Sequence, residues 1–193
     1  MEMAYIGMGA NLPSAAGPPD VTLAEALEWL NQCGRVVRRS SLYSTAPVGV
    51  ADQPRFLNAV AALETKLTPR QLLEELLRIE RAFGRDRSGE VRNGPRTLDL
   101  DLLLYGDRVM EEAGLEIPHP RLTERLFVLV PLAEIASNVM DAARQRSVAE
   151  LLQDFKTRFP SENDAIVRIE SDAWRACSVA DGDVRAERPD VNR

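Results

Sequence analysis

Two carboxylates separated by one residue are the first feature of this sequence that could carry chemistry. Asp99 and Asp101 lie in the segment RTLDLD (residues 96–101), which runs on into the apolar residues LLLY. In a strand, both aspartates point to one face and the leucines to the other, with about 7 Å between the aspartate Cα atoms. Carboxylates this close repel each other unless a cation lies between them, and Mg²⁺ prefers such oxygen ligands. The pattern therefore indicates a divalent-metal site, although two acids on an open strand face are commonly just solvated.

Arginines gather in the residues that lead into the two aspartates. Their clustering stands out because the chain has 24 basic and 30 acidic residues and a formal net charge of −6. A local arginine patch on an acidic protein suits a small polyanion, whereas a long nucleic acid requires a broader basic surface. Arginine offers a planar pair of donors to phosphate oxygens, so arginines beside a carboxylate-bound metal indicate phosphoryl transfer. The arginines are Arg78, Arg81, Arg85, Arg87, Arg92 and Arg96.

The composition of the whole chain argues against several other kinds of protein. Its 193 residues suit one main core, and no apolar run reaches the length of about 18 residues that crosses a membrane. No signal peptide is visible, and Cys33 and Cys177 are too few and too far apart for a zinc motif, so the cytoplasm is the expected location. The P-loop pattern is absent, and residues 7–11 are expected to be a turn rather than a dinucleotide site. His119 is the single histidine, which argues against a Ser-His nucleophile.

The positions of apolar and turn-forming residues predict the elements that must hold these side chains. Strands are expected at residues 3–8, 36–44 and 56–67 and at the aspartate segment, and helices at residues 22–31 and 69–83. Thr22 is expected to cap the first helix, and Thr68 with Gln71 has the form of a capping box for the second. The order β-α-β-β-α-β predicts an α+β, ferredoxin-like fold, in which a mostly antiparallel sheet has flanking helices packed against one face.

The remainder of the chain gives weaker predictions. Residues 122–135 are mostly apolar, and Pro131 is expected to limit how regular a helix they form. Ser147 should start a short helix, residues 165–170 are expected to form a strand, and the chain after about residue 181 is polar and expected to be disordered. We therefore divide the chain into a catalytic domain, residues 1–160, and a partly disordered C-terminal extension, residues 161–193.

Further short motifs extend the aspartate segment into a resemblance to one enzyme family. GPRTLDLD, at residues 94–101, resembles the signature of the 6-hydroxymethyl-7,8-dihydropterin pyrophosphokinases of folate biosynthesis. The resemblance extends over about residues 3–155, and the other matches follow in the order of the family. They are AYIG (4–7), GANL (9–12), STAPVG (44–49), DQP (52–54), FLNA (56–59), IE (79–80), GR (84–85) and PHPR (118–121).

The resemblance implies an activity and its requirements. Enzymes of this family transfer the terminal diphosphate of ATP to the hydroxymethyl group of the pterin, release AMP and use two Mg²⁺ ions. The implied partners are therefore the two small-molecule substrates, with no nucleic acid and no membrane, and a monomer is expected. Two alternatives remain: a non-catalytic nucleotide-binding regulatory module on the same scaffold, and, less favoured, a metal-dependent nuclease.

The resemblance also implies a role for each matched residue. Asp99 and Asp101 would ligate the metal ions, and Arg85 and Arg96 would contact the phosphates during transfer. Each of the other side chains also has an ordinary structural explanation, such as a core phenylalanine or a surface ion pair of Glu80. The implied ATP contacts are Glu80, Arg87, Leu102, His119 and Arg125. The implied pterin contacts are Thr45, Val48 (through its backbone), Phe56, Asn58 and Phe127.

The chain departs from the family at positions that affect substrate binding rather than the reaction. Asn93 stands where many relatives carry an aromatic residue, and Leu77 stands where a glutamine often contacts the nucleotide; Ala46 and Gly114 also differ from common residues. The loop at residues 85–93 is polar and contains a glycine, and it is expected to be mobile until both substrates bind.

Overall fold

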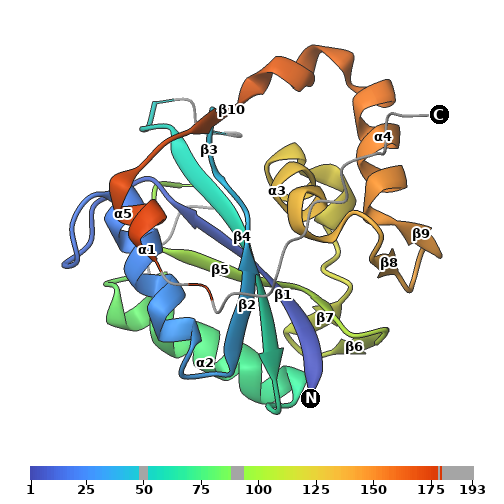
Figure 1. The fold of residues 1–193 in the computed structure, drawn as a ribbon, viewed down its shortest axis with the longest axis horizontal. Coiled ribbons are helices and arrows are strands. Elements are labelled where there is room, and N and C mark those ends of the chain that lie inside the picture. Colours follow the sequence, from blue (N-terminus) through green and yellow to red (C-terminus); the bar gives the residue numbers. More distant parts are fainter. Residues whose placement is uncertain (48–51, 88–93, 178, 180–193) are drawn as a thin grey trace, which may run out of the picture.

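In the part of the chain that the structure describes, an antiparallel sheet of six strands forms the centre of the protein (Figure 1). The computed structural model describes residues 1–47, 52–87, 94–177 and 179. The strand order is β10-β3-β4-β1-β5, and β2 pairs with β4 along the same edge as β3. The strands are β1 (Glu2–Ala10), β2 (Arg35–Arg39), β3 (Leu42–Thr45), β4 (Phe56–Thr65), β5 (Asp99–Tyr105) and β10 (Ile166–Ile169).

Helices cover both faces of this sheet (Figure 1). α1 (Pro19–Leu30) and α2 (Pro69–Ala82) pack on one face, and α3 (Leu126–Ala136) and α4 (Val148–Arg158) pack on the other. The α+β, ferredoxin-like class is confirmed, but the expectation that helices lie against one face only is wrong. The second face carries Tyr5, Val60 and Leu103, and burying these apolar side chains requires a second layer of helices.

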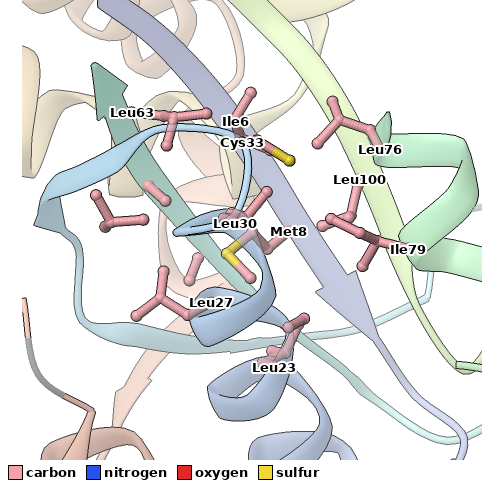
Figure 2. Packing of buried hydrophobic residues seen from close by; sticks show 14 of the residues in the cluster. Ile6, Met8, Leu23, Leu27, Leu30, Cys33, Leu63, Leu76, Ile79 and Leu100 are labelled. Atoms are coloured by element: carbon pink, nitrogen blue, oxygen red, sulfur yellow. The ribbon is translucent and has the colours of Figure 1, made fainter. Parts of the chain in front are cut away.

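The core between the sheet and α1 and α2 follows from two sequence periods. Alternate residues of β1 point into it, because side chains of a strand alternate between faces. The helices contribute residues three or four positions apart, which lie on one face of a helix. Figure 2 shows how these side chains meet between the strands and the helices. They include Ile6 and Met8 of β1, Leu23, Leu27 and Leu30 of α1, and Leu76 and Ile79 of α2.

The predicted starts of α2 and α4 are confirmed, whereas the predicted start of α1 is wrong. Thr68 and Gln71 form the capping box of α2, and Ser147 forms another with Glu150 at α4. α1 begins at Pro19, three residues before its predicted cap, because proline is well suited to the first helical position. Thr22 lies inside the first turn, where its hydroxyl donates to the Gly17 carbonyl at 3.2 Å.

The single strand predicted at residues 36–44 is in fact two strands, β2 and β3. They are separated at Ser40 and Ser41, and both pair with β4. Ser40 is buried, and its hydroxyl accepts a hydrogen bond from the Val60 N–H at 3.0 Å. A side-chain oxygen thus takes the place of a ladder carbonyl at this point, which interrupts the regular pairing.

The C-terminal part of the described chain packs on the same sheet. The strand predicted at residues 165–170 is confirmed as β10, which pairs with β3. A short helix that the sequence did not predict, α5 (Asp172–Ala176), follows it and buries Trp174, whose indole N–H donates to the Ser40 carbonyl at 3.0 Å. The domain boundary at residue 160 stays a prediction, and the disorder expected after residue 181 concerns residues outside the described part.

The remaining elements are short. They are the 3₁₀ helices at Leu122–Glu124 and Pro160–Ala165 and the hairpins β6 (Met110–Glu112) with β7 (Leu115–Ile117) and β8 (Met140–Asp141) with β9 (Arg146–Ser147). Neither hairpin was predicted. The expected effect of Pro131 is wrong, because α3 runs through it from Leu126 to Ala136, and the buried Leu129 and Leu132 anchor the helix on both sides. None of the helices in the described ranges has the length and apolarity to cross a membrane.

Candidate functional site

The candidate site lies on the part of the second sheet face where the central strand has glycines. In the register of the sheet, Gly9 of β1 is paired with Asn58 of β4 on one side and with Asp99 of β5 on the other. Gly7 is likewise paired with Asp101. Directly paired residues project from the same face of a sheet, so Asn58 and both aspartates rise around a floor of glycine backbone. The predicted alternation, with both aspartates on one face of the strand and the alternating leucines on the other, is present, although β5 begins only at Asp99.

The two glycines leave little room for a side chain, because the side chains beside them are close. A Cβ atom on Gly9 would lie 3.2 Å from Asn58 Oδ1 and 3.8 Å from Asp99 Cβ. A Cβ atom on Gly7 would lie 3.3 Å from the side chain of Leu103. The sequence interpretation of residues 7–11 as a turn is wrong, since β1 continues to Ala10. The signal that it missed is the period-2 spacing of the two glycines within an otherwise apolar strand.

A first pocket, of about 470 Å³, opens over Asn58 and Asp99. It contains the predicted pterin-binding residues that fall within the described part of the chain, and Val48 lies outside that part. Asn58 and Thr45 are both buried, and Asn58 Nδ2 donates to Thr45 Oγ1 at 2.8 Å. The pocket is lined by Gly9, Thr45, Ala46, Phe56, Asn58, Arg96, Asp99, Arg125 and Phe127.

Two phenylalanines of this pocket are each paired with an arginine. The guanidinium of Arg96 lies 5.8 Å from the centre of the Phe56 ring, and that of Arg125 lies 5.5 Å from the centre of the Phe127 ring. Both rings therefore stand at the pocket wall with a cation beside them. Both rings are half-buried, and Phe127 also packs against the second core, so it contributes to the core and to the pocket wall.

A second pocket, of about 970 Å³, lies on the far side of Asp101. Three of the predicted ATP contacts line it: Arg87, Leu102 and His119. Leu73, Leu77 and Leu100 add an apolar wall, and the hairpin β6–β7 adds an acidic one with Glu111, Glu112 and Glu116. The sequence did contain a signal for this hairpin, because Ala113 and Gly114 form a two-residue connection and Gly114 has φ of 74°.

Arg85 and Arg96 converge on Asp99 between the two pockets. Arg85 is 8% exposed, and its Nη1 donates to an Asp99 oxygen and, at 3.2 Å, to the Leu98 carbonyl. Arg96 Nη1 donates to the other Asp99 oxygen at 3.0 Å. Burial alone would raise the pKa of Asp99, but the charges of Arg85 and Arg96 hold it below its usual value. Asp99 is therefore ionised and held between two cations.

Glu80 is a buried residue that binds Arg85 and Arg87 and does not line the first or the second pocket. Its side chain is 1% exposed, and Oε1 accepts from Arg85 Nη1 at 2.6 Å and from the Leu100 N–H at 2.8 Å. Oε2 accepts from Arg87 Nη2 at 2.6 Å. The alternative of an ordinary surface ion pair is wrong, because the carboxylate is buried. Glu80 lines neither of the two pockets described above, so it acts on the site through the two arginines.

Asp101 has a different environment from Asp99. Arg125 Nη1 donates to Asp101 Oδ2 at 3.3 Å, and His119 Nε2 lies 3.9 Å from Oδ1, beyond hydrogen-bond distance. Burial and then the charge of Asp99 raise the pKa of Asp101. Burial lowers the pKa of His119, and Nδ1 of this ring accepts from the Arg121 N–H at 3.1 Å. The neutral ring thus carries its proton on Nε2, facing Asp101.

The donor atoms at this point fit a magnesium ion. Asp99 and Asp101 both line a third hollow that lies between the two pockets, and the repulsion that raises the Asp101 pKa would be relieved by a cation there. Within the described ranges, no group of three or more histidine, cysteine, aspartate or glutamate side chains is placed to hold a metal ion. A Mg²⁺ ion bound here would therefore complete its six oxygens with phosphate and water, which is its usual mode beside a nucleotide.

Comparison with known proteins gives relatives of one kind. The family model described as 7,8-dihydro-6-hydroxymethylpterin-pyrophosphokinase matches residues 5–137. The chain is 43% identical over 157 residues to the 2-amino-4-hydroxy-6-hydroxymethyldihydropteridine pyrophosphokinase of Haemophilus influenzae, covering 80% of this chain and 94% of that protein. It is 46% identical over 139 residues to the Bacillus subtilis protein of the same name, covering 71% of this chain and 80% of that protein.

Solved structures share the fold at much lower sequence identity. A Plasmodium falciparum HPPK-DHPS triple mutant has a TM-score of 0.71 at 14% identity and is matched over 88% of this chain. The A437G/K540E variant of the same protein, with pterin and p-hydroxybenzoate, has a TM-score of 0.70 at 15% identity over 88% of this chain. The chain spans about half the length of these solved chains, 48% in both cases.

Proposed function

The chain belongs to the 7,8-dihydro-6-hydroxymethylpterin-pyrophosphokinase family, and on that basis we propose which of its residues bind and align the two substrates. The enzyme is a metal-dependent transferase of folate biosynthesis that moves the diphosphate of ATP to 6-hydroxymethyl-7,8-dihydropterin. The catalytic function is supported over a non-catalytic nucleotide-binding module. Two pockets that meet at a carboxylate pair are also the arrangement that a transfer between two small molecules requires.

We assign the pterin to the first pocket. Phe56 and Phe127 present ring faces or edges to a flat bicyclic ligand. The Asn58 amide is held by Thr45 through Nδ2, which leaves Oδ1 to accept a hydrogen bond from the amino or ring N–H groups of a pterin. Val48 lies outside the described residues, and its backbone contact to the pterin stays a proposal.

We assign ATP to the second pocket. The apolar wall formed by Leu77 and Leu102 suits the adenine base, and Arg87 and His119 provide donors for the phosphates. Arg125 lies between the two pockets, bound to Asp101 and lining the first, so it is placed to contact the phosphate chain as it passes from one pocket to the other. Glu80 supports ATP indirectly, because it fixes Arg87 and Arg85.

Transfer joins the hydroxymethyl oxygen to the β-phosphorus, breaks the bond from that phosphorus to the α–β bridging oxygen, and releases AMP, with the alcohol proton lost to solvent. We propose that Asp99 and Asp101 hold two Mg²⁺ ions, which neutralise charge on the phosphates when bound. Arg85 and Arg96 stand at Asp99, and their donors are placed to follow the negative charge as it moves. Alignment of the substrates by the two pockets provides the remaining rate enhancement.

The position of the two aspartates carries this proposal. Asp99 lines the first pocket, Asp101 lines the second, and both line the hollow between them. These carboxylates would hold a metal ion that neutralises the charge of a phosphate chain bound beside them. Since the described residues of one chain line both pockets, we further propose that the enzyme works as a monomer. A cytoplasmic location is proposed from Cys33 and Cys177, which are both free thiols.

The test is AMP release from ATP, measured with and without the pterin and Mg²⁺. We expect release to require both, and Asp101→Ala to lose at least about a hundredfold in turnover. Asp107→Ala is the matched control, because Asp107 is exposed in the turn after the same strand and should retain full activity. Full activity in Asp101→Ala would refute the metal role, and ATP binding without pterin-dependent AMP release would favour the binding module.

A further inference from the structure

Asn11 is a buried polar residue at the edge of the site for which the mechanism above has no role. It follows the last residue of β1 and is 3% exposed. It lines neither the first nor the second pocket. A buried side-chain amide is costly unless its donors and acceptor are satisfied, so the identity of its partners explains why an asparagine is present.

One set of bonds ties Asn11 to the backbone of Arg96. Asn11 Oδ1 accepts from the Arg96 N–H at 2.8 Å. The Arg96 carbonyl accepts from the backbone N–H groups of both Asn11 and Leu12, each at 3.0 Å. The backbone N–H and carbonyl of Arg96 are therefore both held by the two residues that follow β1. This fixes the point from which the Arg96 side chain reaches Asp99.

The other end of the same amide holds a different segment. Asn11 Nδ2 donates to Gln53 Oε1 at 3.0 Å and to the Pro54 carbonyl at 3.0 Å. These residues lead directly into Phe56 and β4. The orientation of the amide is determined by these partners, because one end faces an N–H donor and the other faces two oxygen acceptors.

We propose that Asn11 is a positioning residue that fixes Arg96, on the phosphate side, relative to the segment carrying Phe56, on the pterin side. Its single amide contacts both segments, which are 42 residues or more apart in the chain. The proposal rests on the assignment of the pterin to the first pocket. Asn11 thus sets the spacing between a group that meets the transferred phosphate and a group that meets its acceptor.

Asn11→Asp tests the contacts of Nδ2 with Gln53 and Pro54 separately from the contact of Oδ1 with Arg96. The carboxylate keeps an acceptor for the Arg96 N–H but places an oxygen, instead of an N–H donor, against Gln53 Oε1 and the Pro54 carbonyl. We expect the dissociation constant of the pterin, measured by its fluorescence with a non-hydrolysable ATP analogue present, to rise about tenfold or more. The dissociation constant of the ATP analogue should change less than about twofold, because the second pocket is not touched.

Two further variants distinguish positioning from a general loss of structure. Gln53→Ala removes one of the two bonds on the pterin side, so it should weaken pterin binding less, and its effect should be less than additive with that of Asn11→Asp. Asn31→Ala is the control: its side chain also accepts a backbone N–H, that of Val36 at 2.9 Å, but Asn31 is exposed and lines neither pocket. This control should leave both dissociation constants unchanged.

Pterin binding by Asn11→Asp that equals the wild type would overturn the proposal. An equal weakening of pterin and ATP-analogue binding would overturn it as well, in favour of a structural role alone. Failure of the wild type itself to bind the pterin would instead refute the proposed function, so the two ideas fail separately.

Discussion

Replacing Glu80 with glutamine tests whether one buried carboxylate organises the arginines of the active site. The substitution keeps the shape of the side chain but removes its charge. The amide oxygen can still accept from Leu100 and Arg85, whereas the new NH₂ group faces the donors of Arg87. Arg85, with 5% of its side chain exposed, would then share the single charge of Asp99 with Arg96.

The size of the effect follows from the burial of each partner. Breaking a buried ion pair by removing one partner costs about 3–5 kcal/mol, because the other charge is left uncompensated. The Arg87 side chain is 52% exposed, so water replaces most of that contact and it adds little. We therefore expect a loss of about 3 kcal/mol in the free energy of unfolding, at the lower end of that range, since Arg85 retains Asp99. In a chain of this length that lowers Tm by about 6–12 °C.

The assay is urea unfolding of Glu80→Gln beside Glu75→Gln, with AMP release measured on both. Glu75 lies on the same helix and pairs with Arg78 at 2.7 Å, but both side chains are well exposed, so its loss should cost less than about 1 kcal/mol. We also expect kcat of Glu80→Gln to fall at least about tenfold, because Arg85 is no longer fixed at Asp99. Equal stability losses in the two variants, with kcat unchanged, would refute the reasoning.

Three further substitutions test separate parts of the structure. Gly9→Ala places a Cβ 3.2 Å from Asn58 Oδ1, so pterin binding should weaken several-fold while ATP-analogue binding is unchanged; unaltered pterin binding would contradict the glycine floor. Leu77→Gln adds a polar group to the wall of the second pocket and should lower KM for ATP by about fivefold, the value of one hydrogen bond, with KM for the pterin as the control. Trp174→Ala should cost about 3–5 kcal/mol of unfolding free energy, because the indole is 4% exposed; a loss as small as that of the exposed Arg175→Ala would show that the C-terminal segment is dispensable for stability.

The sequence predicted those elements whose signals are local. Both capping boxes were readable because the cap and its partner are three residues apart, and alternation placed Asp99 and Asp101 on one face. The break between β2 and β3 was not readable, because it depends on the Ser40 hydroxyl meeting the Val60 N–H across the sheet. The second layer of helices was missed for a similar reason, since its partner surface comes from three different strands.

The sequence predicted the polar and aromatic side chains of the candidate site. It did not predict the buried support beneath them or the glycines between them. Thr45, Phe56, Asn58 and Phe127, which the resemblance implies as pterin contacts, all line one pocket, and their binding of the pterin stays a prediction. Nothing local in the sequence shows that Glu80 is buried under two arginines, because its burial results from β5 passing over α2. The role of Gly7 and Gly9 could not be predicted either, because it depends on which side chains lie beside them on the adjacent strands.

A comparison along β1 shows how the fold separates stability from catalysis. Toward α1 and α2 the strand presents Ile6 and Met8, which are buried along the same stretch as the site. On the opposite face, Tyr5 packs against the layer of α3 and α4, and the next two positions on that face are Gly7 and Gly9. Glycine in a strand and like charges on a neighbouring strand are both locally unfavourable. The glycines of β1 and the aspartates of β5 lie together at the candidate site. The opposite face of the same strands packs into the continuous core against α1 and α2, and this core supplies the stability that the site lacks.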